Sequence, residues 1–168
     1  MITREDRHTA KYIMTDEELQ IQFENQTLPF DLWTHRMHVR IAYIYSKNLS
    51  YSTSLIRLRN GIKAYNKKNN VIETQATGYN ETMTVAFLRL IRTTMESYEE
   101  ILPTKDSESF CDKHPHLLAK TILRAFYSSE RRGLPEAKTQ FIEPDLSSLP
   151  EPQPNKAGEV TAYSRTSS

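Results

Sequence analysis

The sequence predicts an all-α protein: a single-domain bundle of about five to seven helices with an extended, proline-rich C-terminal tail. Apolar residues in the middle of the chain recur at helical spacing, and no segment alternates convincingly with period two. The 168 residues include only four glycines, too few for a β fold dense in turns. We expect a flexible N-terminal segment over residues 1–14, the helical domain over 15–142 and the tail over 143–168.

The first two predicted helices are marked by capping signals and by a proline. Residues 15–18, Thr-Asp-Glu-Glu, form a capping box that starts a short helix, and Leu28-Pro29 ends the segment. The second helix starts at Asp31 or Thr34 and runs to about Lys47.

The third and fourth predicted helices are the longest. The third starts at Ser52 or Thr53 and carries one apolar stripe. The stripe consists of Leu55, Leu58, Ile62 and Tyr65. Asn80 caps the fourth helix, which runs from Glu81 to about Tyr98. Residues 83–91 are almost entirely apolar, so we expect this helix to be the most buried element.

Short helices and then a tail are expected in the C-terminal part. Residues 107–114 form one short helix, Pro115 starts another that continues to Tyr127, and Pro135 starts a last one toward Phe141. Four of the eight prolines fall within residues 143–154, which indicates an extended, solvated tail that still lays some apolar side chains on the domain.

Composition excludes several classes of protein. Lys plus Arg number 22 and Asp plus Glu 21, a net charge of +1 that gives no overall attraction to nucleic acid or to an anionic membrane. The scattered glycines exclude a glycine-rich phosphate loop. The single cysteine, Cys111, excludes an intrachain disulfide. No apolar run is long enough for a membrane span and the N-terminus lacks a signal-peptide core, so we expect a cytoplasmic protein.

Basic residues gather on one face of the third helix. They are Arg57, Arg59, Lys63, Lys67 and Lys68. Because aromatic residues for base stacking are few on this face, a solvated helix surface is the better interpretation than a nucleic-acid site. We expect neither nucleic acid nor membrane as a partner.

Two histidines one helical turn apart are the most informative polar residues. On a helical wheel His38 lies within the apolar arc of its helix and His35 at the edge of that arc, while Arg36 and Arg40 mark the solvent face. Imidazoles at this spacing point to a common spot. The pattern suits two ligands of one metal ion, or a base and its partner.

A carboxylate on a second helix completes a candidate metal site. Glu81 lies in the first turn of the most apolar helix, and two histidines with one carboxylate are the usual ligands of a divalent metal with open coordination positions. The sequence therefore predicts zinc or iron held by His35, His38 and Glu81. Zinc would supply hydroxide from bound water, and iron would leave room for oxygen and substrate.

Other polar residues are candidates for contact with a small-molecule substrate. Tyr79 or Tyr127 would act as proton donor, and Arg40 or Asn66 would hold a polar group of the substrate. Structural roles are open for all of them, because most tyrosines at helical spacing belong to a core. Glu81 stabilises a helix N-terminus by about 0.3–1 kcal/mol without any metal, and a buried histidine can be satisfied by a carbonyl.

The chain resembles a group of small bacterial and fungal proteins of uncharacterised activity. Their shared segments are W-T-H-x-x-H-x-R, matched here by residues 33–40, and Y-[H/N]-E-T, matched by residues 79–82. Further likeness lies in Leu28-Pro29 and in residues 61–66 and 144–150, so the resemblance covers roughly residues 19–150. Many members have histidine where this chain has Asn80. The resemblance implies a family unit and names no reaction.

Three functions remain open from the sequence. The first is a metal-dependent small-molecule enzyme, a hydrolase, lyase or oxygenase, that uses His35, His38 and Glu81. The second is a helical binding or scaffold protein in which the same residues form a buried polar network. The third is a metal-free acid–base enzyme that uses His38 against Glu81.

Overall fold

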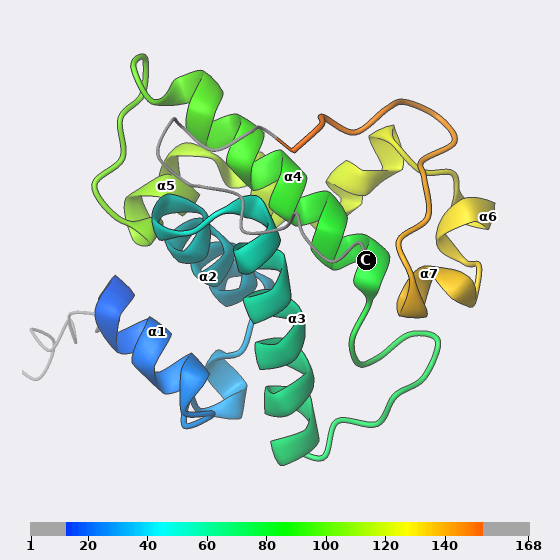
Figure 1. Cartoon of the computed structure of the whole chain (residues 1–168), viewed down its shortest axis with the longest axis horizontal. Helices are drawn as coiled ribbons and strands as arrows, with labels where there is room; N and C mark the ends of the chain where they lie inside the picture. The colour runs from blue at the N-terminus through cyan, green and yellow to red at the C-terminus, as the bar shows by residue number, and fades with distance from the viewer. Residues whose placement is uncertain (1–12, 153–168) are drawn as a thin grey trace, which may run out of the picture.

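The protein is all-α over residues 13–152, the part of the chain that the computed structural model describes (Figure 1). This confirms the predicted fold class. The α-helices there are α1 (Asp16–Glu24), α2 (His35–Asn48), α3 (Tyr51–Lys68), α4 (Glu81–Tyr98), α5 (Ser107–Lys113), α6 (Ser129–Arg132) and α7 (Glu136–Thr139). Three 3₁₀ helices accompany them, η1 (Phe30–Leu32), η2 (Pro115–Leu118) and η3 (Lys120–Ala125). None of the helices in this part is long and apolar enough to span a membrane.

Side-chain caps fix the starts of the long helices. The Thr15 hydroxyl accepts a hydrogen bond from the Glu18 amide, and the Glu18 carboxylate accepts one from the Thr15 amide, which confirms the capping box. The Asn80 side chain accepts from the Met83 amide at 2.9 Å, and α4 has the predicted bounds. The prediction for α3 was wrong at its start, because Ser50 provides the cap.

The predicted helix from Pro115 to Tyr127 is instead two 3₁₀ helices. The chain is extended at Ala119, which separates η2 from η3. The Leu117 carbonyl, which a continuous α-helix would use for its own hydrogen bonding, accepts a hydrogen bond from the His35 ring at 3.0 Å. A side chain of α2 therefore binds the chain at the point where the helix was expected to continue.

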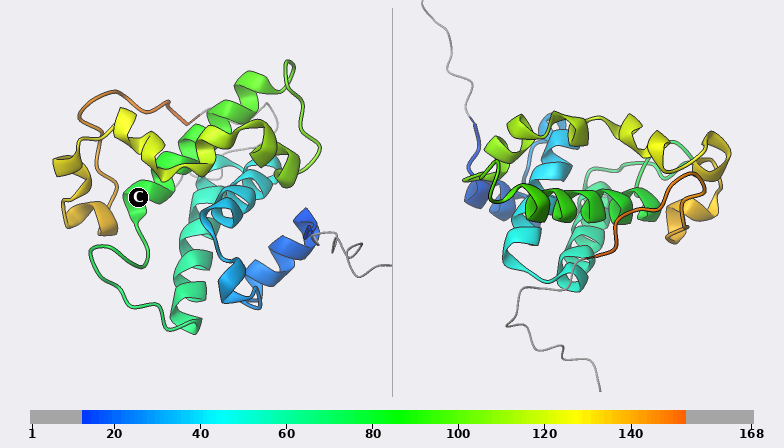
Figure 2. Two further views of the ribbon diagram at one scale, coloured as in Figure 1. Left: turned by 180° about the vertical axis from the view of Figure 1, so that it is seen from behind. Right: turned by 90° about the horizontal axis from the view of Figure 1, so that it is seen from above.

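Helix α2 lies at the centre of the bundle and contacts α1, α3, α4 and α5. Seven consecutive residues, 39–45, are buried, so this stretch is enclosed on every side. Figures 1 and 2 show α4 lying across α2 and α3, and it buries eight of its eighteen residues. α4 buries more residues than α2, but α2 buries the larger fraction, seven of fourteen, so the prediction that α4 would be the most buried element missed the central place of α2.

Arg40 is buried, with 1% of its surface exposed, so its predicted place on the solvent face was wrong. Its guanidinium donates to the Ser107 hydroxyl at 2.7 Å and to the Met14 carbonyl at 2.5 Å. It also forms ion pairs with Glu108 at 3.3 Å and Asp16 at 3.5 Å. The start of α1 and the start of α5 cover the face of α2 that the wheel assigned to water.

The described part of the predicted tail, residues 143–152, contains no helix but packs on the domain. Leu149 is 5% exposed, the Leu146 amide donates to the Phe126 carbonyl, and the Ser128 amide donates to Asp145. These contacts confirm the expectation that tail residues lie against the domain surface. Residues 1–12 and 153–168 lie outside the described residues, and the predictions for them stay predictions.

Candidate functional site

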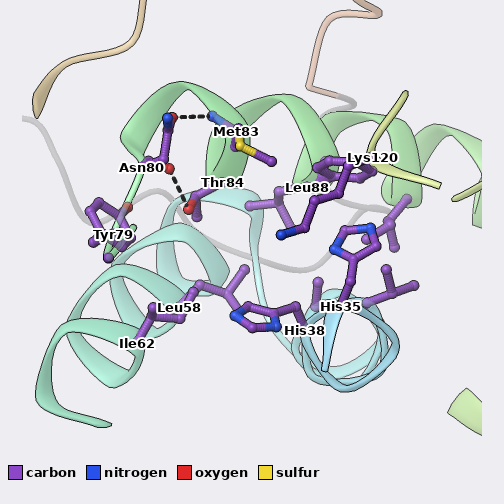
Figure 3. A pocket seen from close by; sticks show the side chains of 15 residues that line it. His35, His38, Leu58, Ile62, Tyr79, Asn80, Met83, Thr84, Leu88 and Lys120 are labelled. Atoms are coloured by element: carbon purple, nitrogen blue, oxygen red, sulfur yellow. Dashed lines mark hydrogen bonds between the residues drawn. The ribbon is translucent and has the colours of Figure 1, made fainter. Parts of the chain in front are cut away.

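A cavity of about 120 Å³ lies between α2, α3 and α4 (Figure 3). Its walls are mainly apolar, and six of the residues that form them are Ala42, Leu58, Ile62, Met83, Leu88 and Ile91. The loop before α4 and the start of η3 complete the enclosure through residues 78–80 and Lys120. His35 and His38 both line this cavity, as the sequence predicted for a shared site.

His38 is held in one orientation and one neutral tautomer. Its Nδ1 lies 2.8 Å from the Thr34 carbonyl, which can only accept, so Nδ1 carries the proton and Nε2 carries a lone pair. The ring packs on Trp33 with the centroids 3.8 Å apart. Burial is the main cause that lowers the pKa of His38 to about 4, and the nearby charge of Lys120 acts in the same direction.

His35 is neutral for similar reasons. Its Nε2 donates to the Leu117 carbonyl at 3.0 Å, so Nδ1 is the unprotonated nitrogen. The ring packs edge-on against Phe87, with the centroids 4.6 Å apart, and burial lowers the pKa of His35. The two imidazole centroids are 6.4 Å apart. Among the described residues, neither remaining ring nitrogen has a hydrogen-bond partner.

Lys120 brings a positive charge to the same cavity. Figure 3 shows its side chain extending from η3 with the amino group pointing into the space beside the imidazoles. The residue is exposed, so it stands at the mouth. Sequence reasoning missed Lys120, because a lysine at a helix surface is commonplace and the extended residue directly before it, Ala119, was not predicted.

Glu81 does not join the histidines. Its carboxylate accepts hydrogen bonds from the Arg59 guanidinium, with Nε at 3.0 Å, and from the Tyr79 hydroxyl at 2.6 Å. The Arg59 hydrogen bonds are the main cause that lowers the pKa of Glu81, and Glu81 is not among the residues that line the cavity. The predicted set of His35, His38 and Glu81 is therefore not brought together, because the Glu81 carboxylate is paired with Arg59.

The rest of the described chain offers no substitute for the missing ligand. No group of three or more His, Cys, Asp or Glu residues within residues 13–152 is placed to hold a metal ion. Binding of zinc or iron by this protein stays a prediction.

The two tyrosines predicted as proton donors are both engaged by other groups. Tyr79 lines the cavity, but its hydroxyl donates to Glu81, and burial raises its pKa. Tyr127 donates to the Ile142 carbonyl at 2.9 Å, and burial raises its pKa to about 12. Tyr127 does not line the cavity.

The predicted substrate contacts also lie elsewhere. Arg40 binds α1 and α5, as described above, and Asn66 is buried in α3, with 8% of its surface exposed. Neither residue lines the cavity. The structure thus brings together His35, His38 and Tyr79 from the predicted set and adds Lys120 and Asn80.

The loop that carries Tyr79 and Asn80 is fixed by charged side chains. The Glu73 carboxylate accepts from the Tyr79 amide at 3.0 Å, and Lys138 of α7 binds Glu73 and the carbonyls of Thr74 and Thr77. Gly78 has φ +90°, a backbone conformation that other residues rarely adopt. The wall of the cavity formed by this loop is thus tied to α7.

Comparison with known proteins gives no significant match to a family model, to a curated protein or to a solved structure. The resemblance in the 33–40 and 79–82 segments stays a prediction.

Proposed function

We propose that this protein binds a small molecule in the cavity between α2, α3 and α4. The proposal rests on one observation: the neutral imidazoles of His35 and His38 line the same, otherwise mainly apolar cavity, and each has one ring nitrogen without a hydrogen-bond partner among the described residues. Binding sites for small molecules have this composition, with apolar walls and a few fixed polar groups that set the orientation of the ligand.

The size of the cavity limits the ligand. A designed cavity of about 150 Å³ in another protein binds benzene, so 120 Å³ accepts a molecule of roughly that size or smaller. Larger cavities, of about 300–1,000 Å³, are typical for drug-sized ligands. We therefore expect a compact metabolite, with any longer extension leaving through the mouth beside Lys120.

The state of the histidines favours binding over acid–base catalysis. General bases act best when their pKa lies near the working pH, whereas the pKa of His38 is lowered to about 4. The proposed catalytic partner, Glu81, is paired with Arg59. The imidazoles therefore serve best as fixed hydrogen-bond acceptors for a bound molecule.

Filling the cavity tests the proposal. Ala42 lines it, so Ala42→Leu adds three carbon atoms in the space that the ligand needs. Saturation-transfer NMR with phenol, butanol, butyrate, butyramide, benzoate and benzamide should detect binding of at least one probe to the native protein and loss of that signal in Ala42→Leu.

Ala125→Leu is the matched control, because Ala125 is exposed on η3 and does not line the cavity. This variant should bind as the native protein does. If Ala42→Leu does not fold, as judged by circular dichroism, the smaller Ala42→Val replaces it. Equal signals from native protein and a folded cavity-filling variant would refute binding at this place.

A further inference from the structure

The cavity has an unbalanced charge. Of the fifteen residues that line it, Lys120 alone carries a formal charge at neutral pH, and none is an aspartate or a glutamate. The nearest buried carboxylate behind the wall, Glu81, is neutralised by Arg59. An ammonium group at the mouth of a cavity that is lined by no carboxylate attracts an anion.

The second polar feature is an acceptor. His38 carries its proton on Nδ1, bound to Thr34, so Nε2 offers a lone pair from the far end of the ring. The open nitrogen of His35 is Nδ1, the one nearer its own backbone, which leaves His38 better placed to reach a ligand. A lone pair binds a hydrogen-bond donor and disfavours a bare carboxylate oxygen.

We infer that the occupant of this cavity is a compact hydroxycarboxylate, whose carboxylate pairs with the Lys120 ammonium group and whose hydroxyl donates to His38 Nε2. This inference rests on the proposed function and names the class of ligand for the same site. The short apolar body of the ligand contacts walls such as Leu58, Ile62 and Leu88.

The orientation of His38 is firm enough for this role. The Trp33 ring covers its face at 3.8 Å, and Thr34 fixes Nδ1. The Thr34 carbonyl also accepts the Met37 and His38 amides, so it keeps partners when the imidazole is replaced. His38→Phe thus removes the acceptor, preserves a ring against Trp33 and leaves no carbonyl unpaired.

Calorimetric titration with four kinds of probe separates the two contacts. The probes are the positional isomers of hydroxybutyrate, butyrate, and the amides of both. One hydroxybutyrate isomer should bind about threefold to fivefold tighter than its amide, because an ion pair with an exposed ammonium group such as that of Lys120 adds only modestly to binding. It should bind about threefold to tenfold tighter than butyrate, which lacks the hydroxyl.

Each variant should lose one of these two preferences and keep the other. Lys120→Met should abolish the preference for acid over amide and keep the preference for the hydroxyl, and His38→Phe should do the reverse. Lys105→Met and His116→Phe are the controls, since both residues are exposed and neither lines the cavity. Both controls should retain both preferences.

Three results would overturn the inference. If the amides bind as tightly as the acids, the site does not select an anion. If inorganic phosphate binds more tightly than any hydroxybutyrate, the preferred anion is not a carboxylate. If His38→Phe keeps the preference for the hydroxyl, His38 is not the acceptor of that group. If cavity-filling Ala42→Leu still blocks these probes, only the ligand class fails, whereas absence of all binding would refute the proposed function itself.

Discussion

His38 shows how burial sets the state of a single basic residue. Its ring lies against Trp33, with one nitrogen held by a carbonyl and the other facing the cavity. Burial withdraws the ring from water, so the charged form is disfavoured and the pKa is lowered to about 4 from 6.5. The same residue that offers an acceptor to a ligand therefore also makes stability depend on pH.

Replacing His38 should make the free energy of unfolding depend less on pH under acidic conditions. Between pH 6.5 and about 4 the unfolded chain binds a proton on His38 that the folded chain does not, so the free energy of unfolding falls as pH falls. The slope from this residue reaches at most about 1.4 kcal/mol per pH unit, falls to half of its maximum at pH 6.5 and declines toward zero above that pH.

Urea denaturation between about pH 5 and 6.5, above the range in which most carboxylates titrate, measures this slope. In His38→Phe the free energy of unfolding should change less with pH than in the native protein. Part of the pH dependence should remain, because burial also lowers the pKa of His35 and His114. The exposed-site variant His116→Phe is the control, and its curve should stay closer to the native one than that of His38→Phe does. A slope in His38→Phe equal to the native one would show that His38 titrates normally in the folded state.

The residues that sequence reasoning misplaced share a physical cause. Arg40 is bound by Ser107, which lies 67 positions away, and Glu81 is bound by Arg59, which lies 22 positions away. A helical wheel reports only the direction of a side chain, whereas its partner depends on which other helix covers that face. His35 and His38 were predicted correctly as neighbours, because their proximity is set within one helical turn.

At the scale of elements, local signals determined the helix boundaries. Caps and periodicity act over a few residues, so α4 was predicted from Glu81 to Tyr98 and is found there. The break at Ala119 was not predicted, because the His35 ring that binds the Leu117 carbonyl comes from 82 positions away. Lys120 follows directly after that break and lines the cavity, so the break and this site residue were both missed.

The cap of α4 should be worth a measurable part of the stability. Asn80→Ala removes the acceptor of the Met83 amide and should cost about 1 kcal/mol in the free energy of unfolding. The matched control is Asn60→Ala: Asn60 is exposed within α3, where alanine is the better helix former, so this change should be neutral or slightly stabilising.

Urea denaturation followed by circular dichroism compares the two alanine variants directly. The same chemical change is thus expected to have a clear cost at a helix start and none inside a helix. Equal stability of Asn80→Ala and Asn60→Ala would mean that the α4 cap contributes nothing.

At the scale of the whole molecule, two groups of charged residues join parts of the chain that are far apart. Arg40 connects α2 to the starts of α1 and α5, and Arg59 connects α3 to α4 through Glu81. The Arg40 group lies where the helices pack, and the Arg59 group lies behind the Tyr79 wall of the cavity. Only the second is coupled to the proposed ligand site.

Arg40→Met should therefore destabilise the bundle as a whole. The change keeps a long apolar side chain but leaves the carboxylates of Asp16 and Glu108 without their shared cation. Loss of one partner of a buried ion pair costs about 3–5 kcal/mol, and we expect the lower end, since both carboxylates keep about a quarter of their surface in water. Removal of the exposed pair in Arg57→Met should cost about 1 kcal/mol or less.

Two probes distinguish global destabilisation from local detachment of α1. Trp33 is the only tryptophan and stacks on Phe23 of α1 at 5.1 Å, so its fluorescence reports whether α1 is docked, while circular dichroism reports all helices. In Arg40→Met both signals should shift together to lower urea concentration. An earlier fluorescence transition would show that Arg40 holds α1 alone, whereas a stability equal to that of Arg57→Met would show that the buried group adds no more than a surface pair.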